Sequence, residues 1–395
     1  MPEHEQHPPA SRPAPWRNPQ VRAIAFQVIA LAILAWAGYT IFQNTLHNMQ
    51  ERGIHTGFGF LGQPAGFGII FSLIPYDETM SYGRTFLVGL LNTLLVSGIG
   101  IVLATIVGFI AGIARLSKNW LVSRIAAAYI EIFRNIPLLL QIFFWYFAVL
   151  RALPSPRQSM HLGDSVFLNN RGLYVPAPVS QPGMGLVWIA LLIAIVAVIA
   201  VRFWARRRQL RTGQPFHTFW VGLAIVVGMP LVTFLATGRP ISFDLPRLQG
   251  FNFSGGMGLI PEFVALLAAL TIYTGTFIAE TVRAGILSVR HGQTEAALSL
   301  GLPQGLVLRL VVIPQAMRVI IPPLTSQYLN LTKNSSLATA IGYPDLVAVF
   351  MGTTLNQTGK AVEIVAMTMA VYLAISLAIS FVMNMYNRAV ALKER

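Results

Sequence analysis

Long apolar runs constrain the fold of this chain more than any other feature. A helix needs about 20 mostly apolar residues to cross a bilayer, because every backbone polar group must be satisfied inside the span. Eight runs meet this requirement: residues 22–43, 86–113, 126–151, 185–203, 217–237, 259–282, 320–343 and 361–387. Only 11% of the residues are charged, whereas about 25% is usual in soluble domains. The sequence therefore predicts an all-α integral membrane protein with about eight transmembrane helices.

The basic residues follow the loops between these runs. The net charge is +14, but no single soluble segment gathers the charge as a nucleic-acid-binding face would, so no nucleic-acid partner is expected. If the N-terminus lies inside, the cytoplasmic segments carry more than twice as many Lys and Arg as the outer ones. The positive-inside rule then places both termini in the cytoplasm, and the clearest topological anchor is Arg206–Arg208.

The runs and loops divide the chain into five segments. They are a Pro-rich cytoplasmic tail that we expect to be disordered (1–20), a first span with an outer segment (21–81), the first part of a core (82–152), an inserted outer loop with a helix pair (153–258), and the second part of the core (259–390). The last segment contains a cytoplasmic loop at 283–319. Without the first span and the inserted pair, five spans remain, which start outside and finish inside.

One span carries a pair of glycines at close-packing spacing. Gly108 and Gly112 form a GxxxG pattern, and small residues at this spacing mark helix–helix contacts in lipid. The contact can lie within the chain or between subunits.

The loop 283–319 predicts two short helices. Thr294 suits an N-cap and Glu295 suits the first turn, while Gly301 can adopt the left-handed conformation that ends a helix. A second helix is expected from Gln304 to Val312, closed by Pro314. Ala296 and Ala297 would leave one side of the first helix nearly bare, so a partner's groove could close around it. The alternative is an interfacial helix that rests on lipid.

This loop resembles the cytoplasmic signature of the membrane subunits of ATP-binding-cassette (ABC) importers. That signature reads E-A-A, three residues, G, nine residues, I-x-L-P, and the chain has Glu295-Ala296-Ala297, Gly301 and Val311-Val312-Ile313-Pro314. The resemblance implies the five-helix core of a type I importer. It also implies that Glu295, Ala296, Ala297, Gly301, Ile313 and Pro314 couple the chain to a separate ATPase.

Further segments narrow the resemblance. They are Glu131-Ile-Phe-Arg134-Asn-Ile-Pro137, Glu280-Thr-Val-Arg283-Ala-Gly285, Gly292-Gln293 and Lys333-Asn-Ser-Ser336-Leu337. These are similar to segments of the polar amino-acid permeases, whereas the run Tyr82-Gly83-Arg84-Thr85 and the extra spans look like the general L-amino-acid permeases of Gram-negative bacteria. The resemblance implies a transporter subunit and not an enzyme, in a bacterial inner membrane, that moves L-amino acids from periplasm to cytoplasm. It implies a periplasmic amino-acid-binding protein, a second similar permease and ATPase copies that hold ATP and Mg, with no cofactor in this chain.

Two groups of polar residues are candidates for the transport path. Glu131 and Arg134 lie three apart on one helix face, which predicts an ion pair at the inner gate. The span 320–343 is the most polar one, so its polar face must meet protein or the path rather than lipid. Its candidate pathway residues are Asn330, Lys333, Asn334 and Ser336. Lys333 could meet a substrate carboxylate, or it could extend towards the membrane interface.

Two other classes of function stay open. An ion-coupled secondary transporter should show a repeat with interrupted helices in matching halves, which the sequence lacks. A membrane-embedded enzyme would need catalytic side chains gathered at membrane depth, where the spans clearly offer only Glu131 and Glu280. No catalytic or metal site is predicted: the chain has no cysteine, and Gly57-Phe-Gly59-Phe-Leu-Gly62 lacks the strand and helix of a dinucleotide site.

Overall fold

The structure is a computed structural model that describes residues 19–51, 56–214 and 216–390. The predicted tail 1–20 lies outside the described residues, except for Pro19 and Gln20, which begin the first helix. In the described ranges, seven helices are long and apolar enough to cross a membrane, or eight when one bent helix pair counts as a span. This agrees with the eight predicted runs.

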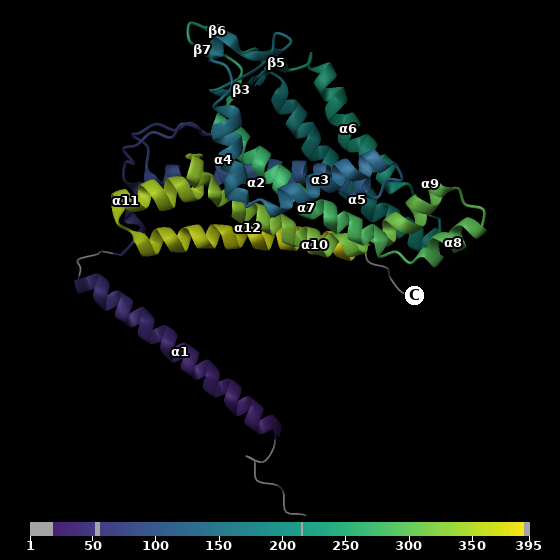
Figure 1. The fold of residues 1–395 in the computed structure, drawn as a ribbon, viewed down its shortest axis with the longest axis horizontal. Helices are drawn as coiled ribbons and strands as arrows, with labels where there is room; N and C mark the ends of the chain where they lie inside the picture. Colours follow the sequence, from purple (N-terminus) through teal and green to yellow (C-terminus); the bar gives the residue numbers. More distant parts are fainter. Residues whose placement is uncertain (1–18, 52–55, 215, 391–395) are drawn as a thin grey trace, which may run out of the picture.

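Four long helices and several broken ones form the core (Figure 1). The long helices are α2 (Tyr82–Arg115), α7 (Pro261–Leu287), α10 (Ile313–Asn334) and α12 (Ala361–Val390). The shorter elements are η2 (Phe58–Gly62), α3 (Trp120–Asn135), α4 (Leu138–Phe143), η3 (Phe144–Leu150), α8 (His291–Ser299), α9 (Gln304–Val307), η5 (Leu308–Val312), η6 (Ser335–Ile341), η7 (Val347–Thr354) and α11 (Leu355–Thr358). Helix α1 (Pro19–Glu51) lies apart from this core, and none of its most apolar stretch is buried.

The predicted continuous span 126–151 is wrong. In its place α3 ends at Asn135, and α4 with η3 continues at an angle of 105°. Pro137 explains the break, because proline lacks an amide donor and forces the residue before it out of the helical region. Ile136 accordingly has extended backbone angles, φ −90° and ψ 126°.

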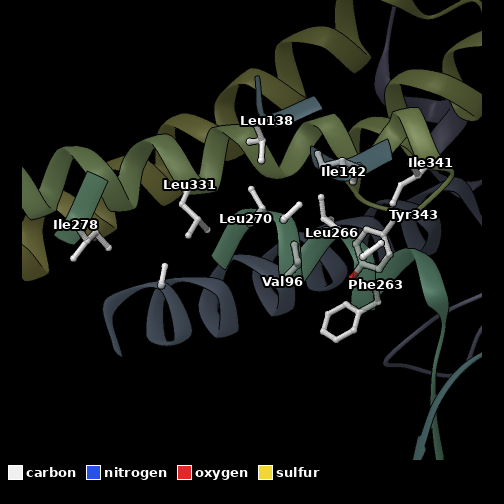
Figure 2. Packing of buried hydrophobic residues seen from close by; sticks show 14 of the residues in the cluster. Val96, Leu138, Ile142, Phe263, Leu266, Leu270, Ile278, Leu331, Ile341 and Tyr343 are labelled. Carbon is white, nitrogen blue, oxygen red and sulfur yellow. The ribbon is translucent and has the colours of Figure 1, made fainter. Parts of the chain in front are cut away.

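The hydrophobic core is built around α7, whose buried side chains face α2, α4, α10 and η6. Figure 2 shows Phe263, Leu266, Leu270 and Ile278 of α7 lined up against the neighbouring helices. Each of these four side chains is at most 3% exposed. Since α7 is the most buried of the candidate spans, it is the helix on which the others are positioned.

The GxxxG pair of α2 brings the α2 backbone against α7. A Cβ added at Gly108 would lie 2.5 Å from the Cβ of Ile278, and one added at Gly112 would lie 2.6 Å from the carbonyl oxygen of Ala279. Neither position has room for a side chain, so both glycines serve helix packing within this chain. Of the two alternatives left open by the sequence, the contact within one chain is the correct one.

The inserted segment forms a helical hairpin topped by short strands (Figure 1). The hairpin consists of α5 (Met184–Thr212) and α6 (Thr218–Ala236). The strands are β1 (Met160–Leu162), β2 (Val166–Asn169), β3 (Gly172–Val175), β4 (Ala177–Ser180), β5 (Ile241–Asp244), β6 (Arg247–Gln249), β7 (Asn252–Ser254) and β8 (Met257–Leu259), with the short turn η4 (Pro156–Gln158) before them. They pair antiparallel in the orders β1-β2-β3-β8, β4-β5 and β6-β7. The sequence did not predict these strands, whose length of three or four residues fits the high proline content.

Candidate coupling and translocation site

Helix α8 is a short exposed helix that follows α7 after a link of three residues. It starts at His291, four residues earlier than the predicted N-cap Thr294 implies, and Arg290 occupies the N-cap position. Thr294 therefore lies inside α8, and Arg290 provides no side-chain cap. Glu295 is also one turn further along than predicted, where its Oε1 lies 2.9 Å from Nδ1 of His291, with both side chains exposed.

Gly301 ends α8 as predicted. Its φ of +77° is in the left-handed region, which glycine adopts without the penalty that a Cβ brings. The amide of Gly301 donates to the carbonyl of Leu298 at 2.9 Å, and the amide of Leu302 donates back to Ala297 at 3.4 Å. These are the two hydrogen bonds of a Schellman motif, so the chain turns sharply from α8 towards α9.

The two alanines of α8 have different surroundings. Ala296 is exposed, whereas Ala297 is 5% exposed and packs against Val307 of α9 and Val312 of η5. The prediction that both alanines leave a bare side for a partner is wrong for Ala297, because its methyl group fixes α8 to the following helix. The exposed residues of α8 and its C-cap include Glu295, Ala296 and two apolar side chains that the sequence did not indicate, Leu298 of α8 and the C-cap residue Leu300.

Pro314 does not close the second helix, contrary to prediction. Residues 308–312 form a wider turn of π type, and α10 continues from Ile313. Pro314 then sits in the first turn of α10, where a missing amide donor costs little. The helical stretch Gln304–Ile341 joins the α8 region directly to the polar span. Ile313 is exposed and Pro314 half-buried.

Helix α10 has a buried apolar face and an exposed polar face. Ile320, Ile321 and Leu331 are buried in the core. Ser326, Asn330 and Lys333 are exposed, and their spacing of four and three residues places them on one side of the helix. Asn334 and Ser336 are half-buried, and the Ser336 hydroxyl donates to the carbonyl of Lys333 at 2.7 Å. Of the candidate pathway residues, Asn330 and Lys333 thus lie on a face that the described chain leaves uncovered.

The predicted Glu131–Arg134 ion pair is not formed. The Arg134 guanidinium lies over the ring of Phe277, 5.5 Å from its centre, and Glu280 instead pairs with Arg283, whose Nε donates to the two carboxylate oxygens at 3.1 and 3.0 Å. Glu131 and Arg134 are both exposed and line a cavity of about 400 Å³ that Glu280 and Arg283 also line. Among the described residues, no group of three or more His, Asp or Glu could hold a metal ion.

A buried polar network that the sequence did not predict holds residues 343–346, which follow η6, against α2. The Asn92 amide donates to the carbonyls of Phe71 and Pro344 at 3.0 and 2.9 Å, and the Tyr343 hydroxyl donates to the Asn92 carbonyl at 3.0 Å. The amide of Leu346 donates to the Thr93 hydroxyl at 3.0 Å. The sequence feature that could have indicated this network is the pair of adjacent polar residues Asn92 and Thr93 inside the apolar run 86–113.

A helical membrane core with an exposed short helix between two spans, and a polar helix face at its side, defines an integral-membrane transport subunit. The chain belongs to the family described as binding-protein-dependent transport system inner membrane component, whose model matches residues 104–392.

Close relatives share this chain's length. It is 55% identical to the putative amino-acid ABC transporter permease protein YhdX of Escherichia coli, with 96% of each chain covered. It is 53% identical to the general L-amino acid transport system permease protein AapQ of Rhizobium johnstonii, over 96% of this chain and 94% of the relative. With the glutamate/glutamine/aspartate/asparagine transport system permease protein BztB of Rhodobacter capsulatus the identity is 43%, over 95% of both. The chain is therefore a multi-pass amino-acid ABC permease subunit of the inner membrane.

Proposed function

We propose that this subunit imports L-amino acids from periplasm to cytoplasm, driven by a separate ATPase that grips α8. The observation that carries this proposal is the shape of the α8 region. Helix α8 exposes Glu295, Ala296 and Leu300 on one side, while Ala297 on the other side is fixed to α9 and η5. A push on the exposed side would thus pass through a packed contact into the helical stretch 304–341.

The arrangement of the two ends of the core supports the proposed orientation in the membrane. Helices α8 and α11 lie at opposite ends of the long axis (Figure 1). The positive-inside rule assigns the α8 end to the cytoplasm, so the α11 end faces the periplasm, where an amino-acid-binding protein would deliver substrate. Both termini then lie in the cytoplasm.

The exposed polar face of α10 supports a second permease subunit. Polar side chains such as Asn330 and Lys333 are unfavourable in contact with lipid tails. A similar subunit placed against this face would enclose them in a path between two copies of α10. Differential binding of ATP to the closed and open ATPase pair would then switch access to that path, since a ligand shifts an equilibrium only when its affinity for the two states differs.

Transport by reconstituted vesicles tests the proposal. We expect vesicles that contain this chain with its copurifying subunits to accumulate labelled L-amino acids, tested as a panel, only when ATP is present on the α8 side. Uptake driven by a proton or sodium gradient without ATP would identify an ion-coupled secondary transporter and contradict the proposal. Vesicles loaded with a non-hydrolysable ATP analogue are the control for binding without hydrolysis.

Lys333 provides a test of the pathway. Lys333 is exposed on the polar face of α10. Its ammonium group can bind the carboxylate that every amino acid carries. Because a hydrogen bond to a charged group contributes about 1.5–3 kcal/mol, we expect Lys333→Met to lower the apparent substrate affinity or the uptake rate by about tenfold or more.

Lys333→Arg is the matched variant, since it retains the charge and should keep a large part of the uptake. Equal uptake by wild type and Lys333→Met, at equal amounts in the membrane, would remove Lys333 from the path.

A further inference from the structure

A large cavity lies outside the core, between the two helices of the inserted hairpin. Its volume is about 830 Å³, within the range of about 300–1,000 Å³ that is usual for ligand sites. Helices α5 and α6 pack on each other, and none of the core helices packs closely on either within the described chain. No described residue of the core helices lines the cavity, so it lies apart from the α10 face proposed for transport.

One face of α5 provides the basic wall of this cavity. Arg202, Ala205, Arg206 and Gln209 all line it, and their spacing of three, four and seven residues from Arg202 places them on a single side of the helix. Arg207 and Arg211 lie on the opposite side and do not line the cavity. The need for positive charge at a cytoplasmic end explains five arginines on α5, but it does not explain why two of them converge on one cavity.

The cavity is graded from polar to apolar along the hairpin. Near the loop between the helices, Arg206 and Gln209 of α5 face Thr218 of α6. At 1.5 Å per residue, the apolar lining at Val198 of α5 and Val226 of α6 lies about 12 Å from that at Arg206 and Thr218. At this apolar end the helices come close, because a Cβ on Gly222 would lie 3.4 Å from Val198.

The wall nearest the loop is held in place by aromatic contacts. The ring of Phe216 meets that of Trp204 edge-on, with centres 5.2 Å apart, and the guanidinium of Arg208 lies over both rings. Arg208 is thereby engaged beside the cavity, while Arg202 and Arg206 remain on its lining.

No acidic group of the hairpin is available to neutralise these arginines. Residues 184–236 contain no Asp or Glu, and among the described residues no carboxylate lies within ion-pairing distance of Arg202 or Arg206. The donors of these exposed guanidinium groups are therefore available to an anion from outside the chain, and arginine forks match phosphate oxygens well.

From this geometry we propose that the α5–α6 cavity binds an anionic phospholipid. The phosphate would sit between Arg202 and Arg206, with Gln209 beside it, and the acyl chains would follow the apolar wall formed by Leu223 and Val226. Basic pockets between membrane helices are known to bind anionic headgroups. The apolar depth favours a lipid over a soluble phosphate or an acidic protein, neither of which would use Val198 or Val226.

Lipid titration of the purified full chain in detergent, read by native mass spectrometry, tests this proposal. We expect phosphatidylglycerol to bind wild type more tightly than phosphatidylcholine. The double variant Arg202→Gln/Arg206→Gln should weaken phosphatidylglycerol binding by about 30-fold, since each arginine contributes about fivefold near anionic lipid.

Arg207→Gln/Arg211→Gln is the matched control, because it removes the same charge from the other side of the same helix. It should retain binding to within a few fold. Equal weakening in both double variants would show that lipid binding depends on general surface charge and not on this cavity, and it would overturn the proposal. It would also be overturned if inorganic phosphate alone displaced the bound lipid, or if the variants lost a copurifying protein while lipid binding stayed unchanged.

Discussion

Replacement of Gly108 by valine is expected to prevent stable packing of the permease core. A Cβ at this position would lie 2.5 Å from both Cβ and Cγ2 of Ile278 and 3.0 Å from the carbonyl oxygen of Gly275. None of these atoms is the far end of a flexible side chain, so α2 and α7 would have to separate. Overpacking of this kind costs about 1–3 kcal/mol. Thermal unfolding of the purified chain in detergent, together with its amount in the membrane, measures the effect.

Gly98→Val is the matched control. It lies on the same helix, and no atom is within 4 Å of the position its Cβ would take. We expect its stability to stay close to wild type. If Gly98→Val and Gly108→Val destabilise the chain equally, valine itself disturbs the helix and the close approach of α2 and α7 is not the cause.

The presence of the long helices was well predicted, because one physical requirement determines where they form. Each apolar run must satisfy its own backbone hydrogen bonds in lipid, so runs such as 86–113 and 259–282 became α2 and α7. The break at Pro137 was visible in the sequence, but apolarity on both sides of it suggested one span. A chain can stay apolar and still turn by 105°, and hydropathy alone does not report that angle.

Contacts between distant residues were harder to predict. The spacing of Glu131 and Arg134 permits an ion pair, but α7 places the ring of Phe277 against the Arg134 guanidinium instead. Local spacing says which side chains share a face, whereas the partners that compete for them come from tertiary packing. The short strands of residues 160–180 and 241–259 were missed for a similar reason. Each is only three or four residues long and forms by pairing with another short strand.

The loop 283–319 contains a correct and an incorrect prediction within ten residues of each other. Gly301 was predicted correctly because a left-handed turn depends on its own backbone. Ala297 was predicted to be open to contact with a partner, yet it packs on Val307 and Val312 of its own chain. The two neighbouring alanines of the signature therefore serve different contacts, and this difference can be measured.

Cysteine at Ala296 is expected to crosslink to the ATPase, while cysteine at Ala297 is not. The chain contains no cysteine, so a single Ala296→Cys or Ala297→Cys substitution gives one thiol on this subunit. Ala296 is exposed and Ala297 is 5% exposed. A maleimide-linked photo-crosslinker should therefore react at position 297 at least about tenfold more slowly, because the site must open locally first. In the assembled importer, the label at position 296 should yield a covalent product with the ATPase subunit.

Leu210→Cys tests whether such a product reflects docking or mere exposure. Leu210 lies near the end of α5 and is 80% exposed, so it should take up the label quickly, yet the hairpin has no role in the proposed ATPase contact. A covalent product from position 296 but not from 210 would locate the ATPase on the open side of α8. If the label at position 296 reaches only lipid while ATP-driven uptake continues, α8 is not where the ATPase acts. If positions 296 and 297 crosslink equally, Ala297 leaves its contact with Val307 and Val312 in the assembled importer. This packed contact then cannot transmit movement from α8 to the helical stretch 304–341.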